Sequence, residues 1–212
     1  GVVEAVEPLD VGGFAREVDD TWRAGLHAEG QFVGVDSGFE FAGITPLLEM
    51  AAIEVSEEVE FLALSVAGMP YYDSLCHAMT TLAAGGFSPH ALSIAGYENA
   101  AVEWIICVFM FLAGANFALQ YRALLGRPGV LVRDEEFRMY TAIVLVAALF
   151  LSGFVWRAGT EMTEAVRHGL FQALSILTTT GYASVDFQPW SDQALMILLT
   201  LMFIGGCAGS AA

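Results

Sequence analysis

The sequence predicts an all-α membrane protein that crosses the bilayer several times. Three observations lead to this fold class: 56% of the 212 residues are hydrophobic with a mean hydropathy of +0.61, long apolar runs are present, and one short pattern occurs twice. A soluble acidic domain of this size is seldom so apolar. Its 12% content of aromatic residues argues against a disordered acidic chain.

The net charge of −16 is concentrated near the first residue. Residues 1–60 contain 14 acidic residues and two arginines, whereas residues 61–212 contain ten acidic residues and six arginines. We expect 1–60 to be a separate acidic segment, either frame-shifted (the interpretation we favour), disordered, a lineage-specific replacement, or a mark of a salt-loving source. The eight basic residues are scattered arginines, so nucleic-acid binding is not expected.

Apolar runs predict the membrane helices. Residues 100–121 would span about 33 Å as a helix and residues 139–156 about 27 Å, and both lengths suit a bilayer core. A third run begins at 194 and is expected to continue toward 212, although glycines interrupt it. Four arginines lie between 122 and 138, so this connector is predicted to be cytoplasmic.

Two shorter helices are predicted before the first and third runs. Residues 73–82 and 168–177 are amphipathic but too short to cross a bilayer. Each is followed by a polar loop that contains glycine, over 83–87 and 178–182. A half-span followed by such a loop is typical of a re-entrant segment that lines a cavity or is buried in protein.

The two units align with each other at an offset of 95 residues. About eight positions match, among them Leu75 with Leu170 and the Gly86-Phe87 pair with Gly181-Tyr182. Each unit therefore contains a short helix, a loop with a Gly-aromatic pair, a linker and a long helix. Internal symmetry of this kind is common in transport proteins.

The second of these loops has a composition that suits a dehydrated cation. The carbonyl oxygens of residues 178–181 are placed to line an ion path, the threonine hydroxyls add further oxygen, and Tyr182 is expected to pack behind the loop. The preceding helix points its partly negative end toward the same place. An ordinary tight turn is the alternative, and the repetition of the whole unit favours the ion path.

Several other residues have a structural interpretation. His77 and His168 are expected on helix faces rather than as metal ligands, Glu103 near the lipid headgroups, and Asn116 toward protein or the pore. The three cysteines form no paired pattern and are predicted to be small buried thiols: Cys76, Cys107 and Cys207.

The strings at 77–88 (HAMTTLAAGGFS), 133–139 (RDEEFRM), 178–182 (TTTGY) and 203–210 (FIGGCAGS) carry a family resemblance. On these residues the chain resembles the Trk/Ktr/HKT superfamily of potassium transporters, and its TrkH-like members in particular. The resemblance implies a polytopic fold in which four potassium-channel-like repeats, each helix–pore loop–helix, surround one ion path.

The resemblance also implies particular repeats and site residues. Residues 61–133 would be the second repeat, with its first helix truncated to 61–69, and residues 134–212 the third, with the last helix over 194–212. The implied ion filter, which would hold K+, comprises Ala83, Ala84, Gly85, Gly86, Thr178, Thr179, Thr180 and Gly181. Phe87 and Tyr182 would support the filter, and Gly205, Gly206, Gly209 and Ser210 would begin a gating loop.

The function that this resemblance implies is uptake of K+, with Na+ as the other candidate ion, by a multi-pass protein of the bacterial inner membrane. No enzymatic activity and no bound cofactor are expected. The implied partners are the lipid bilayer, a cytosolic nucleotide-binding regulatory subunit and a second copy of the full-length protein. Both ends are predicted to be cut, which leaves two of the four filter strands.

Two other functions stay open on the sequence. One is a non-transporting membrane anchor or interaction subunit whose acidic head binds a partner. The other is a solute transporter with broken helices, whose half-helix ends bind the solute. An anchor has no need of paired Gly-aromatic loops, and Asn116 is the single polar residue that favours the solute transporter.

Overall fold

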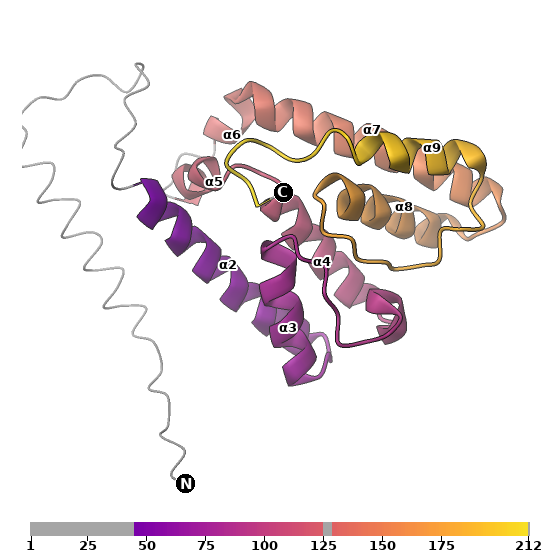
Figure 1. Ribbon diagram of the computed structural model, residues 1–212, viewed down its shortest axis with the longest axis horizontal. Coiled ribbons are helices and arrows are strands. Elements are labelled where there is room, and N and C mark those ends of the chain that lie inside the picture. The colour runs from indigo at the N-terminus through magenta and orange to yellow at the C-terminus, as the bar shows by residue number, and fades with distance from the viewer. Residues whose placement is uncertain (1–44, 125–128, 212) are drawn as a thin grey trace, which may run out of the picture. The chain divides into compact units, whose positions relative to one another are not determined.

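The structure is a computed structural model that describes residues 45–124 and 129–211, and over these ranges it is helical without strands (Figure 1). Most of the acidic segment, residues 1–44, lies outside the described residues. The described elements follow in chain order: α2 (Thr45–Val66), α3 (Tyr71–Leu82), the 3-10 helix η1 (Ser93–Tyr97), α4 (Ala100–Ala113), α5 (Phe117–Leu124), α6 (Gly129–Arg133), α7 (Glu135–Arg157), α8 (Met162–Leu177) and α9 (Asp192–Leu201).

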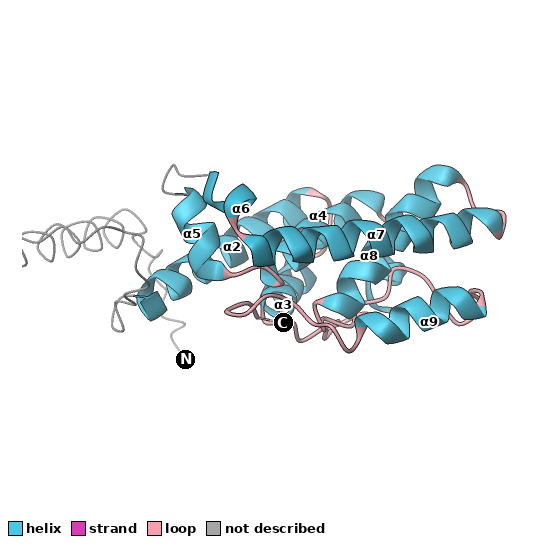
Figure 2. Ribbon diagram, turned by 90° about the horizontal axis from the view of Figure 1, so that it is seen from above, coloured by secondary structure: helices cyan, strands magenta, loops and turns pink. Residues whose placement is uncertain are grey.

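The helices form two similar groups, which Figures 1 and 2 show from two directions. In the first group, α2 packs against α3 and α3 against α4. In the second group, α7 packs against α8, and both of these helices contact α9. Contact between α4 and α8 joins the two groups. The helices that precede the two loops, α3 and α8, are called pore helices after the prediction, and α2–α4 and α7–α9 are the two units.

Helix α2 corrects the predicted start of the membrane body. The prediction that residues 1–60 form a separate segment, and that only 61–69 remain of the following helix, is wrong from residue 45 onward, because one helix runs from Thr45 to Val66. No glycine interrupts this stretch, its proline lies in the first turn, and leucine, alanine and glutamate favour helix. The glutamates of this stretch lower its hydropathy, so the search for apolar runs did not find the helix.

The long helix predicted over 100–121 is broken. Helix α4 ends at Ala113 and α5 begins at Phe117, because Gly114 ends the first helix and the Asn116 side chain caps the second, with its Oδ1 accepting a 3.1 Å hydrogen bond from Leu119 N. The helix predicted over 194–212 ends early, at Leu201. Within the described residues, one helix, α7, is long and apolar enough to cross a membrane.

The three remaining predicted helices end within one residue of the helices in the structure, although each helix in the structure begins two to six residues earlier. The helix predicted over 139–156 is α7, which begins four residues earlier because Asp134 caps it: Oδ1 of Asp134 accepts a 2.8 Å hydrogen bond from Phe137 N. The two short helices end at Leu82 and Leu177, the predicted last residues, and begin two and six residues earlier than predicted. The loops after them are therefore positioned where the sequence placed them.

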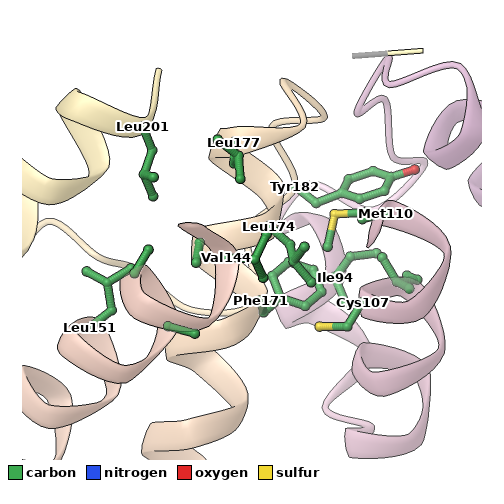
Figure 3. Packing of buried hydrophobic residues seen from close by; sticks show 14 of the residues in the cluster. Ile94, Cys107, Met110, Val144, Leu151, Phe171, Leu174, Leu177, Tyr182 and Leu201 are labelled. Carbon is green, nitrogen blue, oxygen red and sulfur yellow. The ribbon is translucent and has the colours of Figure 1, made fainter. Parts of the chain in front are cut away.

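The core lies between the two groups and around α8. Figure 3 shows Phe171 and Leu174 of α8 between side chains of α7 and of α4. Phe171 is fully buried, whereas large apolar side chains on the outer face of α7, such as Leu149 and Phe150, are exposed on the described chain. An apolar outer surface around a packed interior is expected where lipid is the solvent.

We predict that Phe171→Ala lowers the free energy of unfolding of the full-length protein by about 3–5 kcal/mol, because it leaves a cavity in the core. Thermal unfolding of the detergent-solubilised protein measures the loss. Phe150→Ala is the matched control, since Phe150 is 55% exposed. Equal effects of the two substitutions would contradict the assignment of the core to α8.

Candidate functional site

The loops after α3 and α8 are held by the same bonds at the same offset of 95 residues. The carbonyl of Thr80 accepts hydrogen bonds from the amides of Gly85 at 2.8 Å and Gly86 at 3.3 Å, and the carbonyl of Ser175 accepts one from Gly181 at 3.0 Å. The hydroxyls of Thr80 and Ser175 also donate to the next turn of their loops, to Phe87 O at 2.9 Å and Tyr182 O at 2.6 Å. One hydroxyl residue in each pore helix thus anchors the loop.

The backbone of the two loops alternates in handedness at equivalent positions. Ala84 and Thr179 have φ values of 50° and 58°, and Gly86 and Gly181 have 64° and 83°. Alternation of right- and left-handed residues turns successive amide N–H groups to one side of a strand and the carbonyls to the other. The arrangement is suited to a carbonyl-lined ion path.

Thr179 is the most informative of these residues. A β-branched side chain at positive φ is a rare conformation that costs about 1–3 kcal/mol. The surrounding bonds hold it there: its amide donates to Ile176 O at 3.2 Å, as the Ala84 amide does to Thr81 O at 3.1 Å. Strain held at equivalent points of both loops indicates a functional constraint.

The two loops touch each other at Gly86. A Cβ atom built on Gly86 would lie 1.8 Å from the carbonyl oxygen of Thr180, so no side chain fits at this position. Gly181 differs, because a Cβ atom there would meet nothing within 4 Å. The first glycine is required for close approach of the loops, and the second for its left-handed backbone.

The sequence predicts that the threonine hydroxyls of the second loop line an ion path, but two of the three bond within the protein instead. Oγ1 of Thr178 donates to Leu174 O at 2.9 Å and lies 2.9 Å from Oγ1 of Thr180, and both side chains are buried. These two hydroxyls face protein, because they satisfy the end of α8 and each other. Thr179 is the exposed member of the three.

Tyr182 and Phe87, the aromatic residues that follow the two loops, differ in burial. Tyr182 is buried, and its hydroxyl lies 2.5 Å from Oγ1 of Thr80, in the pore helix of the other unit. Phe87 is 77% exposed, which differs from the prediction that it supports its loop. Tyr182 has α3 beside it with hydroxyls to bond, whereas the Phe87 ring has no polar atom and extends outward from the described chain.

Behind the first loop lies a small polar network. His77 is fully buried, with Nδ1 2.7 Å from the carbonyl of Asp73 and Nε2 3.1 Å from Oγ of Ser88. The carboxylate of Asp73 accepts a 2.7 Å hydrogen bond from the hydroxyl of Tyr97. Burial raises the pKa of Tyr97, and the Asp73 carboxylate raises it further, so this phenol stays a donor. His77 thus links α3 to Ser88, just after the first loop, by hydrogen bonds.

Glu103 also differs from its expected position. Instead of reaching the headgroups, it is 4% exposed, and Oε2 accepts a 2.9 Å hydrogen bond from Nε of Arg167 in the pore helix α8. His168, next in sequence, lies 3.6 Å from the same oxygen and 3.0 Å from Oγ of Ser184. Glu103 of α4 therefore holds α8 of the other unit through a largely buried ion pair, and His168 beside it contacts Ser184 after the second loop.

The predicted gating residues lie in an irregular segment after α9. Gly205 and Gly209 both have φ of 75°, a left-handed backbone, and Oγ of Ser210 donates a 2.6 Å hydrogen bond to Cys207 O. The segment 205–211 lies against the break between α4 and α5, where the Cys207 amide donates to Gly114 O at 2.9 Å. Cys107 and Cys207 are buried, as predicted, and Cys76 is only half-buried.

Two functional features escaped the sequence patterns. No signal paired Glu103 with Arg167, because the residues lie 64 positions apart. The hydrogen bond from the Ala208 amide to Oε1 of Glu136, in the first turn of α7, also joins residues 72 positions apart and has no local signal in the sequence. Over residues 45–124 and 129–211, no group of three or more His, Cys, Asp or Glu side chains is arranged to hold a metal ion.

These features define a class of protein: a helical membrane protein with two groups of helices whose loops are held by similar hydrogen bonds. A solved structure, the potassium transporter TrkH from Vibrio parahaemolyticus, matches with a TM-score of 0.74 and 29% identity, over 90% of this chain and 41% of that one. Among curated proteins, the Trk system potassium uptake protein TrkH of Salmonella typhimurium is 34% identical over 152 residues, 70% of this chain and 32% of its own length.

Trk system potassium uptake protein TrkG of Escherichia coli is 36% identical over 148 residues, which is 68% of this chain and 30% of that protein. The family model described as TrkH, cation transport protein, matches residues 51–212. The chain therefore belongs to the TrkH cation transport protein family. It spans about a third of the length of these curated relatives, and the match begins ten residues before the predicted boundary at 61.

We predict that Glu103→Gln destabilises the full-length protein by about 3 kcal/mol, because it leaves Arg167 without its partner in a buried setting. Thermal unfolding in detergent measures this loss. Glu164→Gln is the control, since Glu164 is an exposed carboxylate on the same helix as Arg167. Restored stability in the Glu103→Arg, Arg167→Glu double variant would support the pair, and no difference between the two single variants would contradict it.

Proposed function

We propose that this chain is part of the pore-forming subunit of a K+ uptake system, and that its two loops supply two strands of a carbonyl-lined selectivity filter. One observation carries the proposal: the loops repeat the same hydrogen bonds and the same alternation of φ signs at an offset of 95 residues. The filter residues would be Ala83–Gly86 and Thr178–Gly181. The membrane potential would drive uptake, since one charge is worth about 2.3 kcal/mol per 100 mV.

The names of the relatives support K+ as the ion, because each is a Trk system potassium uptake protein. Since the chain spans about a third of those proteins, we assign it the second and third of four repeats, with the boundary between them near residue 134. The remaining strands would come from the rest of the full-length protein. We also propose the bacterial inner membrane, a cytosolic nucleotide-binding regulatory subunit and a homodimer for the complete protein.

The two alternative functions are less well supported. A membrane anchor gives no reason to hold Thr179 at positive φ. A solute transporter with broken helices would leave the polar groups of a helix break open for a solute. The break between Ala113 and Phe117 exists, but its carbonyls and amide are bonded to residues 207–211 of the same chain.

We predict that Gly181→Ser in the full-length protein weakens K+ over Na+ selectivity, by about tenfold in the permeability ratio. The side chain has room, so the change acts through the left-handed backbone that holds the carbonyls in line. Complementation of a strain deficient in K+ uptake, at graded K+ and Na+ concentrations, measures the ratio.

The matched control is Gly159→Ser, in the turn between α7 and α8. Gly159 also has positive φ, 105°, and equal space around a Cβ atom, but it lies outside both loops. Strain alone would affect both variants alike, whereas a filter role affects Gly181 only. An unchanged K+/Na+ preference in Gly181→Ser would exclude the assignment of 178–181 to the filter.

A further inference from the structure

His77, in the pore helix α3, contacts a residue that follows each of the two loops. Its Nε2 atom lies 3.1 Å from Oγ of Ser88, just after the first loop. Its ring packs against the ring of Tyr182, which follows the second loop, with the two centroids 5.5 Å apart. The Tyr182 hydroxyl also lies 3.5 Å from the carbonyl oxygen of His77. One fully buried side chain is therefore in contact with the ends of both loops.

The hydrogen bonds of the His77 ring decide which nitrogen carries the proton. Nδ1 lies 2.7 Å from the carbonyl oxygen of Asp73, one turn earlier in α3, and a carbonyl oxygen can only accept. The neutral ring therefore donates from Nδ1, and Nε2 accepts from the Ser88 hydroxyl. Oγ of Ser88 in turn accepts a 3.1 Å hydrogen bond from the His90 amide. The neutral form of His77 is thus the form that holds Ser88.

The second unit also contains a bond between a pore-helix histidine and a serine after the loop. Nδ1 of His168, in α8, lies 3.0 Å from Oγ of Ser184. The histidine lies one turn earlier in this unit, because the position 95 residues after His77 is Gln172. Gln172 is buried, and neither of its amide atoms bonds to the described residues. The same two residue types thus tie the helix to the chain after each loop, which indicates a shared requirement.

Several titratable groups surround the His77 ring. Burial lowers the pKa of His77, and the hydrogen bond to Asp73 and its carboxylate oppose this shift. Tyr97 packs edge-on against the ring, and burial raises the pKa of Tyr182, on its other contact, to about 12. Further groups lie beside these two tyrosines: Cys76 on α3, Glu60 on α2 and His90 after the first loop. The His77 ring is therefore neutral at neutral pH and gains a proton in acid.

Protonation of His77 would change the bond to Ser88. A proton on Nε2 turns this atom from an acceptor into a donor, so the Ser88 hydroxyl can no longer donate to it. The chain after the first loop would then lose the side-chain bond that ties it to α3 in this arrangement. Helix α4 leads from this region toward the connector that is predicted to be cytoplasmic, so a proton would reach His77 from the outside.

We propose that neutral His77 is a positioning residue for both loops, through its bond to Ser88 and its ring contact with Tyr182, and that it thereby sets the preference for K+ over Na+. The inference rests on the proposed function and adds to it a residue outside the filter strands on which ion selectivity depends. Selectivity follows from how carbonyl oxygens are arranged around the ion. A side chain that holds the ends of two strands therefore affects that arrangement without touching the ion.

Two variants remove the hydrogen bond from opposite sides. His77→Phe keeps a ring between Tyr97 and Tyr182 but has no nitrogen, and Ser88→Ala removes the hydroxyl at a half-buried position. In the full-length protein in liposomes, we expect each to lower the K+/Na+ permeability ratio about fivefold, the change that one hydrogen bond produces in an equilibrium. The double variant should lower it no further. His90→Phe is the matched control, because His90 is an exposed histidine beside the same Tyr97 ring.

The outcomes separate this inference from the proposed function. Absence of K+-selective transport in the wild type would reject the proposed function. K+-selective transport in the wild type with unchanged ratios in His77→Phe and Ser88→Ala would reject the positioning role, and so would additive effects in the double variant. Where thermal unfolding shows that His77→Phe does not fold, the ratio in Ser88→Ala decides.

The pH profile of the wild type gives a measurement that needs no substitution. We expect the K+/Na+ ratio to fall as the outside pH is lowered from about 7.5 to about 5, past the ordinary histidine pKa of about 6.5, because protonated Nε2 no longer accepts from Ser88. The fall should remain in His90→Phe and be absent in Ser88→Ala, whose ratio is low throughout. A wild-type ratio that does not change with pH, or a fall that persists in both His77→Phe and Ser88→Ala, would overturn the proposal.

Discussion

Backbone amides and carbonyls that lie away from water need hydrogen-bond partners, and this constraint governs every irregular segment of the structure. The loop after each pore helix bonds to backbone carbonyls in the last turns of that helix, and one hydroxyl residue, Thr80 or Ser175, adds a side-chain bond to its carbonyl bond. Segment 205–211 bonds to the backbone of the break between α4 and α5. In these segments, helix ends and hydroxyl groups supply partners for irregular backbone.

The two repeats use the same backbone bonds but different side chains around them. Tyr182, after the second loop, bonds to Thr80 of α3, and Glu103 of α4 bonds to Arg167 of α8. Both connections run between the repeats rather than within one. The loops are thus positioned as a pair, and the packing of α4 against α8 fixes the distance at which Gly86 meets the Thr180 carbonyl.

The features that depend on local pattern could be predicted from the sequence. Apolar runs and the 95-residue repeat gave the helical class and located the last residues of both pore helices, Leu82 and Leu177. The start of α2 could not be found by hydropathy, because glutamates lower the average of a good helix-forming stretch. The break after Ala113 was hidden because glycine and asparagine are tolerated in apolar helices, and because bonds to residues 207–211, far along the chain, add to the local cap by Asn116.

The site was predictable to a similar degree. Glycine and threonine in a repeated setting indicated the loops, but a hydroxyl can face either side of a strand, and tertiary hydrogen bonds turned Thr178 and Thr180 inward. The pairing of Glu103 with Arg167 depends on how α4 crosses α8, which no local pattern encodes.

Gly114 has a consequence for how this family can diverge in sequence. Any side chain there would collide with Tyr140 of α7 and with Thr178, the first residue of the second loop. A larger residue could be accommodated only if both neighbours became smaller in the same lineage, while the new residue kept a backbone able to end a helix. We therefore expect a larger residue at position 114 to occur among relatives together with smaller residues at 140 and 178.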